Sequence, residues 1–343
     1  MSLPVPIDYA PMEAGTAREI PVGPEWEYEP KWDGFRCLAF RDGEDVNIVS
    51  KSGQPLARYF PEIEAALLSL AAKKFVLDGE LIVTEKRTLN FDALLQRIHP
   101  AESRVRKLAV ETPATLIVFD LLVSERGADL TGREFDERRG ELERFAAKFL
   151  AGRERVRLSP RTRDFDTAKS WFKRMAGPLD GIIAKRVDRP YASGERDSMV
   201  KIKNLRTADC VVGGFRYGSK NRLVGSLLLG LYDDAGLLNH VGFCSGLAIA
   251  QKASLTKQLE SLIEPPGFTG AAPGGPSRWS TERSTEWEPL TPKLVAEVQY
   301  DHFSGERFRH GTKLLHWRPE KRPKECTLRQ VQRESESPLT LLD

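Results

Sequence analysis

The first half of the chain alternates short apolar runs with polar turns. Residues 36–53, "RCLAFRDGEDVNIVSKSG", contain two apolar stretches on either side of Asp42-Gly43, and a second turn signal follows at Ser52-Gly53. Such pairs favour tight turns, because glycine adopts a positive φ without steric cost. The pattern predicts a β-hairpin over residues 36–53.

Segments with two different periods follow this hairpin. Residues 60–74 place apolar side chains at helical spacing behind Pro61, and residues 133–150 have a strongly charged helical pattern. Residues 75–83, "FVLDGELIV", and residues 114–123, "ATLIVFDLLV", are apolar runs of strand length. This mixture predicts an α+β domain in which helices flank sheets.

The pattern changes at about Thr207, where short apolar runs punctuated by glycine begin. Evenly spaced short strands with glycine turns predict a small β-barrel. A domain boundary at about 204–208 therefore divides the chain into residues 1–205 and 206–343. Residues 264–285 are rich in Pro, Gly and Ser, which predicts a mobile loop.

Length and composition agree with two globular domains. The chain has 343 residues, of which 40% are hydrophobic and 29% charged, and one domain usually takes about 100–200 residues. No run approaches the roughly 18 apolar residues of a membrane-spanning helix, and the first residues have no secretory pattern. The four cysteines lack the close spacing of a zinc site. We expect a cytoplasmic protein with reduced cysteines.

Net charge adds little to this picture. A value of +3 is too small to identify a polyanionic partner. Residues 307–324, however, contain seven Lys or Arg side chains and a single acid, Glu320. Such a run either contacts phosphates or solvates a surface, and charge alone does not decide between these interpretations.

Candidate chemistry begins within "EYEPKWDGFRCLAF", where Lys31, Asp33, Gly34 and Arg36 form a Lys-x-Asp-Gly-x-Arg pattern. Asp-Gly is also common in ordinary surface turns, so this pattern alone is moderately specific. Further motifs follow in order: "SKSG" at 50–53, "LDGEL" at 77–81, "FDLL" at 119–122, "DGIIAK" at 180–185 and "MVKIK" at 199–203. Each of them is equally typical of a plain strand or turn, but the ordered set is hard to attribute to chance.

That ordered set resembles the covalent nucleotidyltransferase superfamily of ATP-dependent DNA ligases and mRNA capping enzymes. Three later stretches resemble ATP-dependent DNA ligases of the short bacterial LigC type: "GGFRYGSKNRLVGSLLLGLYD" at 213–233, "AEVQYDHFSGERFRHG" at 296–311 and "HWRPEK" at 316–321. The resemblance covers nearly the whole chain. It implies an adenylation domain of antiparallel sheets flanked by helices over 1–205 and an OB-fold β-barrel domain over 206–343.

The resemblance implies that Lys31 is a nucleophile. An amine attacks the α-phosphate of ATP, expels pyrophosphate and forms a phosphoramidate that holds AMP and can transfer it. Neighbouring cations and a bound metal favour the neutral, nucleophilic amine. Alternation along a strand places Lys201 and Lys203 on one face, and the resemblance implies that this face lines the α-phosphate.

Further ATP-binding roles follow from the resemblance position by position. It implies that Glu29 reads the adenine amino group. Phe119 would stack on the adenine, and Ile183 would cover its other face. Arg36 and Lys51 would contact the ribose and phosphate.

The resemblance also implies a divalent metal, Mg²⁺ or Mn²⁺, beside ATP. Asp180 and Glu80 would serve as metal ligands, and Glu80 would also accept from a ribose hydroxyl. Arg318 and Lys321 of the second domain would swing over the site and orient the leaving pyrophosphate.

Several positions depart from the family pattern. Asp180 stands where glutamate is usual, so its carboxylate reaches one methylene less far and could hold the metal through water. Lys51 replaces an arginine and loses a bidentate fork. Met199 stands where tryptophan is expected, and the run after Arg196 is one residue short, which leaves the phosphate role of that arginine unassigned. Glu320 replaces an aspartate.

The sequence therefore predicts an ATP-dependent DNA ligase that seals nicks in duplex DNA through a lysyl-AMP intermediate and serves repair, recombination or replication. Phosphate contacts would dominate DNA binding. We expect a cytoplasmic bacterial monomer, associated with the nucleoid when it acts, away from membranes and recruited by repair proteins. NAD is not the expected donor, because the four-cysteine zinc module of NAD-dependent ligases is absent.

Two alternatives remain open at this point. A capping-type or RNA-specific nucleotidyltransferase would share the lysine motif and the OB fold, although residues 225–233 and 307–311 are ligase-like. A nucleic-acid-binding protein with an OB barrel would carry Lys31 only as a relic. Charged positions throughout the predicted cleft argue against this second alternative.

Overall fold

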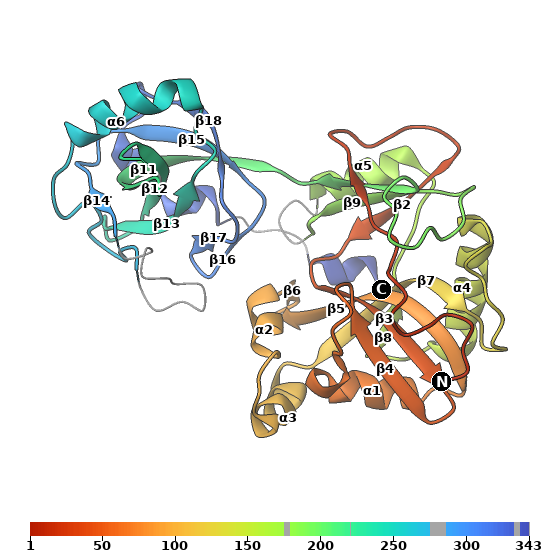
Figure 1. Ribbon diagram of the computed structural model, residues 1–343. Helices are drawn as coiled ribbons and strands as arrows, with labels where there is room; N and C mark the ends of the chain where they lie inside the picture. Colours follow the sequence, from red (N-terminus) through yellow and green to blue (C-terminus); the bar gives the residue numbers. More distant parts are fainter. Residues whose placement is uncertain (175–178, 220, 275–285, 333–336, 343) are drawn as a thin grey trace. The chain divides into compact units, whose positions relative to one another are not determined.

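The computed structural model describes residues 1–174, 179–219, 221–274, 286–332 and 337–342, and the chain divides into two units (Figure 1). Unit 1 contains Met1–Asn204 and the described C-terminal residues 337–342, and unit 2 contains the described residues from Leu205 to Gln332. Within this described part, no helix is long and apolar enough to cross a membrane.

Unit 1 contains two sheets that are mostly antiparallel. The smaller one has the order β1 (Gly15–Thr16), β10 (Met199–Lys203), β9 (Gly181–Arg186) and β2 (Trp26–Lys31), with only β1 and β10 parallel. Its apolar face packs on α5 (Phe165–Arg174), since Tyr28, Ile182 and Ala184 share a buried cluster with Ala168.

The larger sheet of unit 1 has the order β4 (Asp45–Ser50), β3 (Phe35–Asp42), β5 (Lys74–Glu85), β7 (Ala114–Val123) and β8 (Val156–Leu158), with β6 (Thr88–Leu89) beside β5. The predicted hairpin is confirmed: β3 and β4 pair from Cys37↔Ser50 to Asp42↔Asp45, and Gly43 in the turn has φ +66°. The predicted strands at 75–83 and 114–123 correspond to β5 and β7.

Helices pack against the larger sheet. α1 (Pro61–Leu68), α2 (Phe91–Gln96) and α4 (Phe135–Phe149) contact its strands, and α3 (Glu102–Glu111) contacts α1. The charged pattern over 133–150 thus forms α4, which buries Leu142 and Phe145 in the core. The helix predicted over 60–74 ends earlier, at Leu68, because β5 already begins at Lys74 and the chain needs the intervening residues to turn into the sheet.

Two glycines are required where backbone segments approach closely. A Cβ on Gly34 would lie 2.0 Å from the carbonyl oxygen of Leu81, and a Cβ on Gly181 would lie 1.9 Å from that of Ile202. Gly181 also has φ +142°, which favours glycine. These two glycines therefore pack strands together, although their Asp-Gly sequences are equally typical of surface turns.

Unit 2 is built on a sheet with the order β13 (Leu238–Cys244), β12 (Val224–Tyr232), β11 (Arg206–Tyr217), β15 (Val295–Tyr300) and β18 (Lys313–Trp317). A short β14 (Glu288–Pro289) pairs with β11, β16 (Phe303–Ser304) pairs with β17 (Arg307–Phe308), and α6 (Lys252–Glu260) packs on β12. The predicted short strands are present, but among the described residues β13 and β18 do not pair, so the sheet does not close into a barrel.

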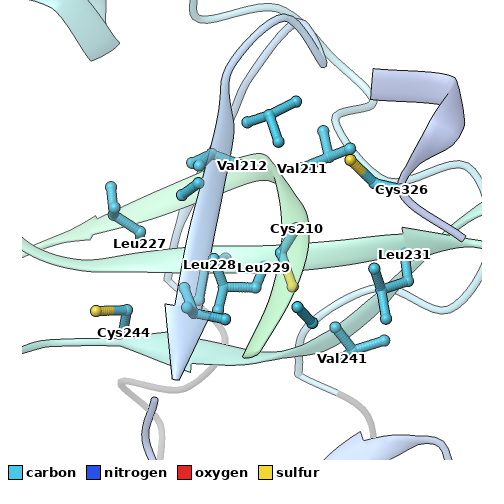
Figure 2. Packing of buried hydrophobic residues seen from close by; sticks show 14 of the residues in the cluster. Cys210, Val211, Val212, Leu227, Leu228, Leu229, Leu231, Val241, Cys244 and Cys326 are labelled. Atoms are coloured by element: carbon cyan, nitrogen blue, oxygen red, sulfur yellow. The ribbon is translucent and has the colours of Figure 1, made fainter. Parts of the chain in front are cut away.

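The core of unit 2 is apolar and contains sulfur (Figure 2). Leu227, Leu229 and Val241 pack there with Cys210 and Cys326. All four cysteines of the chain are buried and free, as the sequence predicted.

The ends of unit 2 differ from the sequence-based division. The boundary between the two units falls between Asn204 and Leu205, but residues 337–342 pack on unit 1 instead of on the second unit, to which the division at 206–343 assigned them. Their leucines enter an apolar cluster of unit 1, a long-range contact that has no local signature in the sequence. Within the predicted mobile loop over 264–285, residues 275–285 lie outside the described part of the chain.

Candidate active site

A pocket lies between the two sheets of unit 1. Its walls come from β2, β9 and β10 of the smaller sheet, from β3, β5 and β7 of the larger one, and from the N-terminal segment. It is lined by Pro11, Met12, Glu13, Ala14, Glu29, Pro30, Lys31, Trp32, Arg36, Lys51, Glu80, Phe119, Ile183, Lys185, Met199 and Lys201. The pocket thus collects Lys31 and most of the residues predicted to surround ATP.

Strand register explains how the smaller sheet presents its polar side chains. Glu29 of β2 lies opposite Ile183 of β9, and Ile183 lies opposite Lys201 of β10, so the three residues form one row across the sheet. Lys31 and Lys185 are two positions from Glu29 and Ile183 on their own strands and so point to the same face. This face of the three strands presents Glu29, Lys31, Lys185 and Lys201 to the pocket.

The larger sheet contributes the opposite wall. Arg36 of β3 lies directly opposite Glu80 of β5. The pairing of β5 with β7 shifts register between Asp78 and Gly79, which leaves Phe119 as the extra residue of a β-bulge. Because a bulge changes the direction of a side chain relative to a regular ladder, it accounts for the presence of Phe119 in the pocket.

Lys31 forms an ion pair with Asp180 at the end of β2. The backbone supports this pair, since the amide of Asp180 donates to the carbonyl of Lys31 at 3.0 Å. Lys201 adds a second amine to the site. Burial lowers the pKa of Lys201, and the nearby charges of Lys31 and Lys203 lower it further.

Glu29 lies in a buried charge network. Its Oε2 is 2.9 Å from Nζ of Lys185, and its Oε1 is 3.4 Å from Nη1 of Arg139. The Lys185 amine also lies 4.7 Å from the ring centroid of Phe119. Sequence reasoning missed Lys185, although its spacing from Ile183 in "DGIIAK" was a usable signal, because alternate residues of a strand share a face.

Arg36 is fixed by a carboxylate at the edge of the pocket. Its Nε and Nη2 lie 2.5 and 2.6 Å from the two oxygens of Asp78, and the Tyr191 hydroxyl donates to the same carboxylate at 2.6 Å. The guanidinium lies 4.5 Å from the centroid of Phe119. Arg36 and Lys185 therefore place two cations against this one ring.

Two further carboxylates of the pocket differ in their environments. Burial raises the pKa of Glu80 to about 7, against the opposing charges of Arg36 and Lys31. Glu13 instead contacts Lys51 at 3.0 Å and Arg196 at 2.6 Å, and these hydrogen bonds lower its pKa. Glu13 was another residue that the sequence analysis assigned no role.

Four of the predicted residues are not part of the pocket lining. Asp180 directly precedes β9 and is not among the lining residues. Lys203 is on β10 but does not line the cavity. Arg318 and Lys321 belong to unit 2, where they contact Asp209 at 3.1 and 3.7 Å. Among the described residues, no group of three or more His, Cys, Asp or Glu side chains is arranged to hold a metal ion.

Comparison with known proteins identifies the class. Residues 12–203 match the family model of the ATP-dependent DNA ligase domain, and residues 220–321 match that of the ATP-dependent DNA ligase C-terminal region. DNA ligase C of Mycobacterium tuberculosis is 42% identical over 356 residues, which cover 99% of this chain and 97% of that protein. The chain belongs to the ATP-dependent DNA ligase family.

Two other comparisons give a more distant relative and a similar fold. The multifunctional non-homologous end joining DNA repair protein LigD of M. tuberculosis is 31% identical over 92% of this chain and 39% of that protein. A solved structure of a Lig E DNA ligase has a TM-score of 0.56 at 14% identity, over 90% of this chain and 99% of that one, and this likeness concerns the fold alone. The nearly full-length match to DNA ligase C makes the chain a short bacterial LigC-type ligase. It is an enzyme that uses ATP and acts on DNA.

Proposed function

We propose that Lys31 is the residue that accepts AMP from ATP, and that the enzyme then passes AMP to the 5′-phosphate of a nick in duplex DNA. The observation that carries this proposal is the position of Lys31 in a pocket together with Glu29, Phe119 and Lys201. These residues offer an acceptor for an amino group, a ring for stacking and a cation for phosphate.

The reaction at Lys31 balances as a substitution at phosphorus. After the ammonium loses a proton, its nitrogen lone pair forms a bond to the α-phosphorus while the bond to the bridging oxygen breaks and pyrophosphate leaves. In the second step a 5′-phosphate oxygen displaces the Lys31 nitrogen, and in the third the 3′-hydroxyl displaces AMP. Lys201, on the same face of the sheet, is placed to stabilise the charge that develops on the α-phosphate.

Adenosine recognition uses the walls of the pocket. The ring of Phe119 stacks on adenine opposite Ile183, and Glu29 accepts from the adenine amino group while Lys185 keeps its carboxylate oriented. Arg36 and Lys51 serve the ribose and phosphate side, and Glu80 accepts from a ribose hydroxyl. Aromatic stacking on a base contributes roughly 1–3 kcal/mol.

Asp180 and Glu80 are the residues we propose to hold a divalent metal. The donor set fits Mg²⁺ or Mn²⁺, because Mg²⁺ commonly takes one or two protein carboxylates and completes its shell with phosphate oxygens and water. Asp180 forms an ion pair with Lys31, and Lys31 and Glu80 line the same pocket. When bound, such an ion neutralises charge on the phosphates during pyrophosphate release.

Unit 2 is proposed to be an OB-fold domain that grips DNA. Its antiparallel strands and its match to the ligase C-terminal region support this proposal. Arg318 and Lys321, in the basic run over 307–324, would orient pyrophosphate during the first step. Similarity to LigD supports a role in DNA repair, where we expect a monomer brought to nicks by repair proteins in the bacterial cytoplasm.

Covalent labelling tests the proposal. The purified chain is incubated with Mg²⁺ and α-labelled ATP or GTP, and label that survives denaturation is measured for wild type, Lys31→Ala and the matched control Lys73→Ala, which removes a lysine paired with Glu44 at the surface. We expect label from ATP in wild type and control, none in Lys31→Ala, and its release as sealed product on addition of nicked DNA. Label that persists in Lys31→Ala would overturn the assignment of Lys31, and label from GTP would favour capping chemistry.

A further inference from the structure

The described C-terminal residues, 337–342, pack on unit 1 (Figure 1). We call this segment the strap. Leu339, Leu341 and Leu342 pack against a buried cluster formed by Trp32, Ile82, Ile117 and Leu179. The strap, together with Leu89, therefore covers this apolar cluster of unit 1.

Polar contacts hold both ends of the strap. The Ser337 hydroxyl donates to the carbonyl of Arg87, in the turn between β5 and β6, and Arg157 of β8 donates to the carbonyl of Leu342. Between them, the short helical turn Pro338–Leu341 packs beside β6. A segment anchored by hydrogen bonds at each end and by leucines in its middle has a defined position on the sheet.

The cluster under the strap contains the neighbours of both members of the Lys31–Asp180 pair. Trp32 follows Lys31 directly, and Leu179 precedes Asp180. The Trp32 indole also donates to Ser159 Oγ at 3.0 Å, which fixes the orientation of its ring. Movement of Trp32 or Leu179 would consequently shift the backbone that carries the amine or the carboxylate.

We propose that the strap is a positioning element for the first reaction step: by packing on the cluster that contains Trp32 and Leu179 it holds Lys31 and Asp180 in the geometry needed to attack ATP. The inference rests on the proposed role of Lys31 as the residue that accepts AMP. Nucleophilic attack requires close alignment of the reacting atoms, and misplacement by about 1 Å can reduce a rate by roughly a hundredfold. The strap acts through this cluster, and none of its described residues lines the pocket.

The proposed role of the strap predicts that formation of lysyl-AMP depends on it more than joining of the nick does. Formation of lysyl-AMP needs Lys31 aligned on ATP. Joining of a nick that already carries AMP on its 5′-phosphate forms no bond to Lys31, because the 3′-hydroxyl displaces AMP directly. Loss of the strap should therefore slow the first reaction much more than the second, whereas a merely structural role would reduce both together.

A double variant, Leu339→Asp/Leu341→Asp, tests this against the matched control Thr340→Asp, which adds a charge at the exposed position between the two leucines. Both are assayed at a temperature where circular dichroism shows them folded. We expect single-turnover labelling with ATP to slow about tenfold or more in the double variant, with joining of pre-adenylylated nicked DNA little changed and the control like wild type. Labelling at the wild-type rate, or equal loss of both reactions, would overturn the proposal.

A truncation gives a second route if the double variant does not fold. Removal of residues 337–343 should slow labelling of the protein by ATP. A synthetic peptide of those residues, "SPLTLLD", added in excess should restore the labelling rate. If the truncated protein is folded and the peptide does not restore labelling, this result would count against positioning by the strap. Lys31→Ala distinguishes failure of the proposed role of Lys31 from failure of the proposed role of the strap. Label that persists in Lys31→Ala would overturn both proposals. Label that is lost in Lys31→Ala but is unaffected by loss of the strap would overturn only the role of the strap.

Discussion

The Lys31 ammonium pairs with the Asp180 carboxylate across 149 positions of sequence. The pair joins the end of β2 to the residue before β9, and the two strands are neighbours in one sheet. We propose Lys31 as the nucleophile and Asp180 as a metal ligand. This single contact therefore places the two proposed chemical groups side by side.

Asp180→Asn should raise the metal requirement of the enzyme. The substitution keeps the size of the side chain and removes the charge that we propose to hold the metal. We expect the Mg²⁺ concentration for half-maximal labelling of the protein by ATP to rise about tenfold, in the range found when metal sites lose supporting groups. Asp188→Asn is the control, because that carboxylate pairs with Arg186 at the surface. An unchanged Mg²⁺ dependence in Asp180→Asn would exclude Asp180 as a metal ligand.

Phe119→Ala should weaken ATP binding. The ring lines the pocket under the cations of Arg36 and Lys185, and stacking on adenine contributes roughly 1–3 kcal/mol. We expect the KM for ATP in the labelling reaction to rise about tenfold. Phe119→Leu fills most of the same space without the aromatic face and should show a similar increase if stacking is responsible. Recovery of the wild-type KM in Phe119→Leu would show that bulk alone is needed.

Lys185→Met should destabilise unit 1. Among the residues that the structure describes, the variant leaves the buried Glu29 carboxylate with Arg139, at 3.4 Å, as its one remaining ion-pair partner. Removal of one partner of a buried ion pair lowers the free energy of unfolding by about 3–5 kcal/mol. Because Arg139 still partly compensates the charge of Glu29, we expect a loss of about 3 kcal/mol, measured by urea unfolding. Lys73→Met, which breaks a surface pair with Glu44, should cost less than about 1 kcal/mol.

A compensating change tests the cause of that loss. Glu29→Gln added to Lys185→Met removes the uncompensated charge, so the double variant should recover much of the lost free energy of unfolding. If the two losses simply add, the effect of Lys185→Met does not arise from its pair with Glu29.

His240 should make the stability of unit 2 depend on pH. Burial, and then the charges of Arg307 and Arg216, lower its pKa from the usual 6.5 to about 4. The unfolded chain therefore binds a proton between these pH values that the folded chain does not bind, and stability falls as the pH decreases from 6.5 to 4. The largest slope for one proton is about 1.4 kcal/mol per pH unit.

Replacement of this ring removes the titration. His240→Phe keeps an aromatic side chain beside Phe268, whose ring centroid lies 5.4 Å from that of His240. We expect the free energy of unfolding of the variant to decrease less between pH 6.5 and 4 than that of wild type. Parallel pH profiles for the two proteins would show that His240 is protonated equally in both states.

The local sequence pattern by itself determined the elements and the class of chemistry. The hairpin at β3–β4 followed from its turn residues, and β7 and α4 followed from their periods, because turn geometry and amphipathic spacing are set by neighbouring residues. The family followed from ordered motifs. The resemblance carried by those motifs also indicated Ile183 and Lys201 as site residues, and both line the pocket together with Lys31.

Tertiary structure decided how distant segments meet. Phe119 enters the pocket through a bulge, Lys185 becomes the partner of Glu29, and the C-terminal leucines reach Trp32 across the length of the chain. Strand register, burial of a charge and long-range apolar packing arise from the balance of many contacts across the sheets. No short stretch of sequence contains that balance, which is why the motifs indicated Lys31 as the proposed nucleophile but not the residues that pack around it.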